Sequence, residues 1–593
     1  MKTVNNIFKH TFFCLALGTT VCSCDLDVEP TSSIATETFW TSEKDAWDNL
    51  NAVYSASIPG AAVHSDSYTN DAYCQYSWES NGAIYQQNGL SALYDEGYNF
   101  ETVRKQNIFL QKIENVPMDE DLKTRFKAEV RAMRAWTYLN LTTTFGKVPL
   151  ITDVLSYDAP NIPRDETSKI REFILNELTE AAAILPEKYA GSYPNEKGRM
   201  TKYAALAVKA RAALYFGDYP TAEAAAKEIM DKGGFSLFQV SELTEAQKKE
   251  AEEMELYIDF DKYGIDRDKF MKGMFSYESL WHTENGNPDN PEYVMTRQYT
   301  ASSWDYQDMT RYTSIRPNQL GGWSSVTPTQ NLVDAYWTVD GKTPSIPSIE
   351  KRMNAYKVIK GDLDEYKAPA GEAKFISFAS GLINSGKLKD YEYMQEFRNR
   401  DSRLYASILF PFKGWYETNY GTNFIYEWIK NGNNESKTGF NFRKMSPLEN
   451  DANNDGQATG DYPCIRYAEV LLIFAEAHTQ TTGFDGQTQA ALNQLRDRCG
   501  MPNVPTSLGK EDGLALIKNE RRIELAGEGL RSDDLSRYGD AYWSAQMNNV
   551  PISTPDGEKV ITMKWDSRMS LRPIPQTAID LNPLLATDQN PGY

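Results

Sequence analysis

Residues 200–232 read MTKYAALAVKARAALYFGDYPTAEAAAKEIMDK and predict the basic unit of the fold. The first half is a helical segment whose small side chains let a second helix approach closely; these are Ala204, Ala205, Ala207, Ala210, Ala212 and Ala213. The run from Gly217 to Pro220 interrupts the helical pattern, and a second alanine-rich helix follows it. The stretch therefore predicts two helices joined by a tight turn.

Similar helical pairs are predicted on both sides of this unit. Less regular pairs occur at 166–188 and 466–499, and amphipathic helices at 101–116 and 122–145. A helix–turn–helix of this length, with small and aromatic residues at the packing positions, resembles a tetratricopeptide repeat. Because the repeats are degenerate, we predict a mostly α fold of stacked tetratricopeptide-like pairs rather than a regular superhelix.

The middle of the chain differs from both ends in composition. Residues 235–460 are rich in Gly, Asn, Pro, Ser and aromatic residues and contain few periodic segments. Loops this long inside a compact protein usually carry function. We therefore predict an irregular, loop-rich ligand-binding region at about 235–460, flanked by the helical scaffold at about 40–234 and 463–540 and followed by a C-terminal tail at 541–593.

The N-terminal segment carries an export signal. In residues 1–23, Lys2 and Lys9 precede a short apolar stretch and small residues, and that stretch is shorter than the roughly 20 residues needed to span a bilayer. Cys24 follows directly, so the segment resembles a lipobox, in which this cysteine is acylated and becomes the mature N-terminus. The alternative is an ordinary signal peptide in which Cys24 is incidental. The acidic residues 25–29 resemble the export tag of lipoproteins on the outer face of the outer membrane, where we expect this protein.

Charge and cysteine content exclude several classes of partner and site. The chain has 82 acidic and 62 basic side chains and a formal net charge of −20, which argues against nucleic acid and anionic lipid surfaces as partners. Beyond the signal segment, Cys74, Cys464 and Cys499 are an odd number with wide spacing, so no disulfide framework is indicated. Buried free thiols at Cys464 and Cys499 are favoured, and a disulfide between them is the alternative.

Residues 466–477, RYAEVLLIFAEA, resemble the signature helix of the SusD/RagB family of outer-membrane nutrient-binding lipoproteins. Six further blocks match the family in the same order. They are AEVRAMRAWTYLNL (128–141), TPTQNLVDAYWTVDGK (327–342), RDSRLYASILFP (400–411), NQLRDRCGMP (493–502), IKNERRIELAGEGLRSDDLSRYG (517–539) and RPIPQTAIDLNPLLATDQNPGY (572–593). With the lipobox, the resemblance covers nearly the whole mature chain.

The resemblance implies an α-helical scaffold of four tetratricopeptide-like pairs and a loop-rich ligand-binding half. It also implies a partner, a SusC-like TonB-dependent transporter, which the lipoprotein covers as a lid. The function it implies is the capture of oligosaccharides for import, without catalysis and without a cofactor. Capture of peptides, as in RagB-like relatives, is the alternative.

Two carboxylates in the matched blocks resemble a catalytic pair. Glu524 and Glu528 lie four residues apart, and a glycoside hydrolase needs two carboxyl groups about 5–9.5 Å apart across an open cleft. Arginines alternate with the carboxylates here, so a charge-compensated scaffold is predicted instead. The sequence contains no HExxH helix, GxSxG elbow or glycine-rich phosphate loop. A surface-anchored glycoside hydrolase is the less favoured alternative.

One acidic run has the spacing of a calcium loop. Asp451, Asn453 and Asp455 match its first three ligand positions. The twelfth position is Tyr462 rather than the bidentate glutamate of such loops, so a polar turn is predicted and an isolated Ca²⁺ site is the alternative.

The ligand site is expected to be aromatic. Sugar rings stack their C–H faces on aromatic side chains, and their hydroxyls need polar partners around the rim. Two loop-like segments, 73–88 and 281–323, supply both kinds of residue. The predicted ligand-binding residues are Tyr73, Tyr76, Trp78, Asn81, Trp281, Tyr299, Trp304, Tyr306, Arg311 and Trp323, with Trp78 and Trp304 as the strongest candidates.

Overall fold

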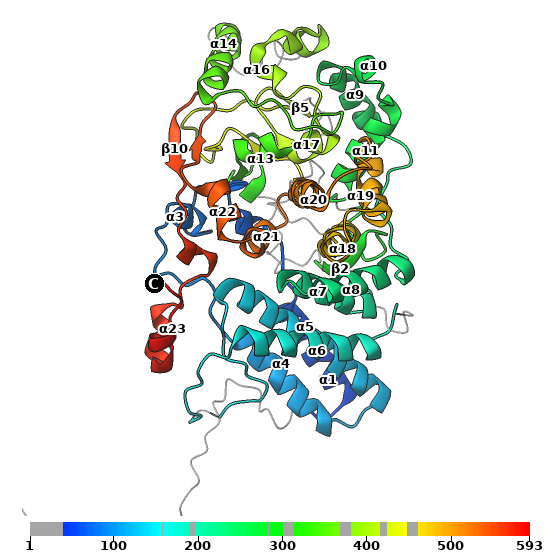
Figure 1. Ribbon diagram of the computed structural model, residues 1–593, viewed down its shortest axis with the longest axis vertical. Helices are drawn as coiled ribbons and strands as arrows, with labels where there is room; N and C mark the ends of the chain where they lie inside the picture. Colours follow the sequence, from blue (N-terminus) through cyan, green and yellow to red (C-terminus); the bar gives the residue numbers. More distant parts are fainter. Residues whose placement is uncertain are drawn as a thin grey trace, which may run out of the picture.

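The computed structural model describes residues 40–156, 158–189, 196–282, 284–299, 314–367, 381–415, 424–446 and 460–593. The predicted signal segment and Cys24 lie outside the described residues. In Figure 1 the blue-to-teal helices of the N-terminal part lie at the bottom and the green helices of the middle part lie at the top. The gold and orange helices that follow them in the chain lie between the two.

A stack of helices forms the scaffold. It consists of α1 (Glu43–Ser57), α4 (Glu101–Lys112), α5 (Glu120–Phe145), α6 (Thr167–Ile184), α7 (Lys202–Tyr215), α8 (Tyr219–Lys232), α18 (Tyr467–Thr481), α19 (Gly486–Arg498) and α20 (Lys510–Glu524). Neighbours in sequence pack on each other from α4 to α8, and α18 then packs on α8, α19 and α20 (Figure 1). The chain therefore leaves the stack after α8 and returns to it at α18. The predicted mostly α fold of stacked helical pairs is confirmed.

The α7–α8 unit forms for local reasons that the sequence contains. Thr201 Oγ1 accepts the N–H of Ala204 at 3.1 Å and so caps α7, while the side chain of Asp218 caps α8. Gly217 between the helices has a φ of +72°, a left-handed conformation that glycine adopts without a Cβ penalty. The six alanines of α7 are fully buried, which lets the flanking helices approach its backbone.

The middle part of the chain has its own core and more helix than predicted. It contains α9 (Glu245–Glu253), α10 (Phe260–Tyr263), α11 (Arg267–Ser279), α13 (Gln330–Ala335), α14 (Ile349–Lys367), α16 (Glu392–Gln395) and α17 (Ser402–Ser407). In α14, Tyr356, Ile359 and Leu363 are buried at helical spacing in this second core. The helical spacing of these apolar residues is not evident from the sequence, because the region has a loop-like composition and exposed polar residues separate its few apolar positions.

The described strands are short and pair as two-stranded antiparallel ribbons. The pairs are β1 (Ala72–Cys74) with β3 (Val326–Pro328), β2 (Tyr293–Arg297) with β8 (Tyr462–Arg466), β4 (Ile408–Leu409) with β7 (Asn441–Phe442), β5 (Gly414–Trp415) with β6 (Phe424–Ile425), and β9 (Pro551–Ser553) with β10 (Lys559–Thr562). In β1–β3, Ala72 lies opposite Pro328 and Cys74 opposite Val326. This ribbon joins the N-terminal part of the chain to its middle.

The C-terminal part folds back on the N-terminal part. Its helices are α21 (Arg531–Tyr538), α22 (Asp540–Met547) and α23 (Gln576–Leu581). Helix α21 contacts α2 (Val63–Asp66), and α22 shares an apolar cluster with α3 (Gly82–Gln86). Tyr85, Leu535, Trp543 and Met569 belong to a third apolar cluster. The buried Tyr85 hydroxyl donates to the carbonyl of Met569 at 2.8 Å. The predicted tail is therefore packed against residues of the first helices.

A buried ion network holds the scaffold to the middle part. We define it as Glu292, Arg403, Arg466, Arg498, Glu520, Glu524 and Glu528, all less than one-tenth exposed. Glu524 accepts from Arg466 Nη1 at 2.8 Å, from Arg403 Nη1 at 3.0 Å and also from Arg498. Although burial acts to raise it, the guanidinium groups of Arg498, Arg466 and Arg403 hold the pKa of Glu524 well below its ordinary value.

Glu528 belongs to the same network through Arg466, whose Nη2 donates to it at 2.7 Å, and through Lys444 at 2.6 Å. Both carboxylates of the apparent catalytic pair are therefore neutralised inside the protein. The predicted charge-compensated scaffold is confirmed.

The three described cysteines are free, as favoured by the sequence. Cys74 and Cys499 are buried and Cys464 is half-buried. Burial raises the pKa of the Cys499 thiol to about 11 and that of Cys464 to about 12. These thiols are therefore protonated at neutral pH and are poor nucleophiles.

His478 ties three scaffold helices together. Its Nδ1 lies 2.7 Å from Glu223 Oε1 on α8, and its Nε2 lies 3.1 Å from Asp485 Oδ2 at the start of α19. Burial acts to lower the pKa of His478, but the hydrogen bonds and charges of Glu223 and Asp485 raise it above its ordinary value. The same contacts lower the pKa of both carboxylates.

This contact predicts a pH-dependent stability. A histidine with a raised folded-state pKa stabilises the protein below its unfolded pKa of about 6.5, and the contribution is lost as the pH rises through the folded value. The stability difference between the wild type and His478→Gln, measured by urea unfolding, should therefore be larger at pH 6 than at pH 9. Glu223→Gln, which removes one carboxylate, should reduce this pH dependence. An equal difference at both pH values would contradict the prediction.

Candidate functional site

Several predicted site residues lie outside the described residues. These are Trp304, Tyr306 and Arg311 of the second aromatic segment and Asp451, Asn453 and Asp455 of the calcium-like run. No group of three or more His, Cys, Asp or Glu side chains that could hold a metal ion occurs in the part of the chain that the structure describes. The roles of these six residues stay predictions.

Two of the predicted rings are in the core. Trp281 is 4% exposed and Tyr299 is 6% exposed. Trp281 lies beside Tyr462, with the ammonium of Lys444 4.8 Å from its ring centroid. The backbone N–H of Tyr299 donates to Asp461 Oδ1 at 3.3 Å. Neither ring therefore presents a free face within the described residues, and their role in ligand binding stays a prediction.

Tyr73 and Asn81 are accessible but point to other parts of the protein. Tyr73, in the middle of β1, is half-buried and packs against the third apolar cluster. Asn81 Nδ2 donates to Glu96 Oε1 at 2.8 Å. Neither residue is among the rings that face solvent together.

Three predicted rings form an exposed aromatic platform, which we define as Tyr76, Trp78 and Trp323. Trp78 is 76% exposed and Trp323 is 39% exposed. The rings of Tyr76 and Trp78 stack on each other with centroids 4.4 Å apart and planes 22° apart. Exposed tryptophan rings such as Trp78 and Trp323 are costly to leave in water, so the platform is a candidate binding surface.

The β1–β3 ribbon brings the rings of the platform together. The last pair of its register is Cys74 opposite Val326, so the segment that carries Tyr76 and Trp78 and the segment that carries Trp323 leave the ribbon at the same end. Gln75 fixes this arrangement, because its backbone N–H donates to the carbonyl of Ser325 at 2.8 Å. Its side-chain Nε2 also donates to the carbonyls of Trp323 and Ser324, at 3.2 and 2.7 Å.

An amide-rich turn lies beside the platform. The Tyr76 hydroxyl donates to Asn434 Oδ1 at 2.8 Å, and Gln75 Nε2 donates to the carbonyl of Glu435 at 3.2 Å. The turn that contains Asn434 also presents Asn431 and Asn433 to solvent. We did not predict these residues, although the run NGNNE at 431–435 is the kind of polar turn that can bind sugar hydroxyls.

Glu79, one residue after Trp78, holds the platform segment to neighbouring parts of the chain through hydrogen bonds. Its Oε1 accepts from Ser325 at 2.8 Å, and its Oε2 contacts His64 Nε2 and Ser314 Oγ, each at 3.1 Å. Burial acts to raise the pKa of Glu79, but these hydrogen bonds and the charge of His64 hold it below its ordinary value. Glu79 is therefore an ionised carboxylate with both oxygens engaged.

Comparison with known proteins identifies the family. The family model described as "SusD family" matches residues 291–593, and the model described as "Starch-binding associating with outer membrane" matches residues 26–214. SusD-like protein P38 of Formosa agariphila is 24% identical over 563 residues, which cover 91% of this chain and 93% of that protein. The chain belongs to the SusD/RagB family.

Solved structures share the fold. The crystal structure of a SusD-like protein from Bacteroides fragilis has a TM-score of 0.70 and 24% identity, over 94% of this chain and 98% of that one. A laminarin-binding SusD-like protein has a TM-score of 0.57 and 20% identity, over 93% of this chain and 100% of that one. Within the described residues, none of the helices combines the length and apolar character needed to cross a membrane.

Proposed function

We propose that this protein captures oligosaccharides on the aromatic platform and passes them, without cleaving them, to a SusC-like TonB-dependent transporter of the outer membrane. The observation that carries the proposal is the stacked pair of the half-buried Tyr76 and the exposed Trp78, together with the exposed Trp323. Membership of a carbohydrate-binding family and the laminarin-binding neighbour support it.

The chemistry of the platform fits a neutral glycan. The flat ring faces can stack on the C–H faces of pyranose rings, and the amides of the 431–434 turn can pair with their hydroxyls. A formal net charge of −20 repels acidic polymers, so uncharged oligosaccharides are the expected substrate class.

The carboxylates near the platform and in the scaffold support binding rather than hydrolysis. A glycoside hydrolase needs one carboxyl group free to protonate the leaving oxygen. Both oxygens of Glu79 accept hydrogen bonds from neighbouring side chains. Glu524 is fully buried among three arginines.

Calorimetry of the purified protein against neutral oligosaccharides, laminarin oligosaccharides included, and against short peptides tests the proposal. Saturable binding of at least one glycan, with no new reducing ends in the same samples, is expected. Binding of peptides alone would favour the RagB-like alternative. Release of reducing ends would favour a hydrolase.

Attachment through Cys24 is part of the proposal. The lipobox-like sequence before this residue and the outer-membrane description of the matching family model support it. Cys24→Ala should release a folded protein that binds glycan but no longer supports uptake, because the lipid attachment point is gone. Fractionation of cells and glycan-dependent growth measure the two effects. A Cys24→Ala protein that stays in the membrane fraction would contradict lipid attachment there.

A further inference from the structure

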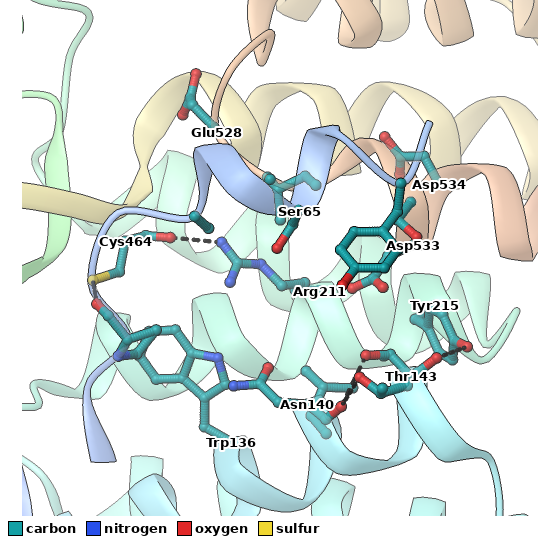
Figure 2. Close-up of a pocket in the computed structure, with 18 of the residues that line it drawn as sticks. Ser65, Trp136, Asn140, Thr143, Arg211, Tyr215, Cys464, Glu528, Asp533 and Asp534 are labelled. Atoms are coloured by element: carbon teal, nitrogen blue, oxygen red, sulfur yellow. Dashed lines mark hydrogen bonds between the residues drawn. The ribbon is translucent and has the colours of Figure 1, made fainter. Parts of the chain in front are cut away.

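A cavity of about 410 Å³ lies between the scaffold helices α5 and α7 and the C-terminal helix α21, separate from the aromatic platform. Figure 2 shows it between α5 and α7 on one side and the segments around Ser65 and Asp533 on the other. Its volume lies within the range of about 300–1,000 Å³ that is usual for small-molecule sites. Asn140 on α5 is both a lining residue and exposed, so the cavity reaches solvent beside it.

Most charged groups around the cavity have partners in the protein. Arg211 donates to Glu469 through Nε at 2.8 Å and through Nη2 at 2.6 Å. Arg521 Nε pairs with Asp534 at 2.8 Å, and Arg537 pairs with Glu476. These pairs leave little unbalanced charge for an ionic ligand to neutralise.

Asp533 is the exception. It lines the cavity at the first turn of α21, and no salt bridge to it occurs among the described residues. Asp533 is half-buried, its side chain faces the cavity (Figure 2), and it is hydrogen-bonded to the side chain of Thr143. Burial and the neighbouring charge of Asp534 raise the pKa of Asp533 to about 6, so the carboxylate is mainly ionised at neutral pH.

The groups around Asp533 indicate which ligand it would accept. Arg211 and Arg572 lie close enough to lower the pKa of Asp533, so a cationic ligand would meet two guanidinium groups beside it. An anionic ligand would be repelled by the negative charge of Asp533 itself. Neutral hydroxyl donors suit an ionised carboxylate, which accepts from two adjacent hydroxyls at once.

The rest of the lining suits the faces and edges of a sugar ring. Tyr68, Trp136 and Tyr215 contribute aromatic surface to the lining, and Asn140, Thr143 and Thr144 contribute polar groups. Aromatic walls combined with a few convergent polar groups are typical of small-ligand sites.

We propose that this cavity is a second binding site, for a free monosaccharide, with Asp533 accepting from the hydroxyls of the sugar. The choice of a sugar among neutral polyols rests on the proposed function of the platform. The site itself rests on the cavity, its opening beside Asn140 and the Asp533 carboxylate, which no salt bridge within the described residues neutralises.

Calorimetry with free D-glucose, D-galactose and D-mannose tests the proposal, carried out in the Trp78→Ala protein so that the platform does not contribute. Saturable binding of at least one hexose is expected. Asp533→Asn should weaken it at least tenfold, and Asn140→Trp, which fills the mouth, should weaken it to a similar extent. The matched controls are Asp268→Asn, an exposed acid in the first turn of α11, and Thr124→Trp, an exposed position on α5 away from the cavity.

Thermal unfolding separates a ligand-binding role of Asp533 from a structural one. Because the fold raises the pKa of Asp533, its ionised form destabilises the folded protein at neutral pH, so Asp533→Asn should raise the unfolding midpoint while it removes hexose binding. No saturable hexose binding, or binding that survives both Asp533→Asn and Asn140→Trp, would overturn the proposal. Hexose binding without oligosaccharide binding by the wild type would support the cavity and contradict the function proposed for the platform.

Discussion

Trp78→Ala is expected to weaken oligosaccharide binding by about 10- to 100-fold while leaving the stability of the protein unchanged. Truncation of a tryptophan that acts as a binding hot spot costs about 2 kcal/mol or more, and each 1.4 kcal/mol is about tenfold in affinity. Trp78 is the most exposed ring of the platform, at 76%, and its ring contact is with Tyr76, so its removal costs little packing.

The measurement is calorimetry with the best glycan of the panel, together with thermal unfolding of each variant. Trp323→Ala should weaken binding in the same direction. Leu93→Ala is the matched control, because Leu93 is 86% exposed and lies outside the platform. If affinity is unchanged in both tryptophan variants, the ligand does not bind at the platform.

Glu524→Gln is expected to destabilise the protein by about 3–5 kcal/mol, the usual cost of removing one partner from a buried ion pair. The substitution keeps the shape of the side chain and removes its charge. The guanidinium groups of Arg403, Arg466 and Arg498 would then lose one of the carboxylates that neutralise them. Because these groups are buried, solvent cannot stabilise the charge left uncompensated. Because the network joins the scaffold to the middle part, the loss should affect the unfolding of both.

Urea unfolding followed by circular dichroism measures this effect, with Glu511→Gln as the control because Glu511 is exposed in the first turn of α20. A loss below about 1 kcal/mol, the range of surface ion pairs, would show that the network is not a main source of stability. Loss of a glycosidase activity in a stably folded Glu524→Gln protein would instead revive the hydrolase alternative.

The parts of the fold that sequence could predict depend on local patterns. The alanine-rich pair at 200–232 carries its own caps and glycine turn, so it forms α7 and α8 as expected. The alternation of arginine and glutamate after Glu520 indicated charge compensation correctly, since such side chains in a packed helix must find partners. The partners themselves were not predictable, because Arg403 and Arg466 come from distant segments.

The candidate site was predictable only in part for the same reason. Composition singles out aromatic residues but does not say which of them face solvent. Trp78 and Trp281 have similar local surroundings in the sequence, yet one is exposed and the other is buried beside the β2–β8 ribbon. The Asn434 turn joins the site through a contact with Tyr76 far from it in the chain, for which no local signal exists.

The β1–β3 ribbon also sets the order in which the site can be completed during synthesis. Gln75 and Trp323, which it brings together, are 248 residues apart in the chain. At about 5–20 residues per second, a nascent chain would carry Trp78 for roughly 10–50 s before its partner strand exists. During that time the edge of β1 is unpaired beside exposed aromatic rings, a combination that favours aggregation. A polypeptide that stops before Val326 would therefore contain every residue of α1–α8 and still lack the completed platform.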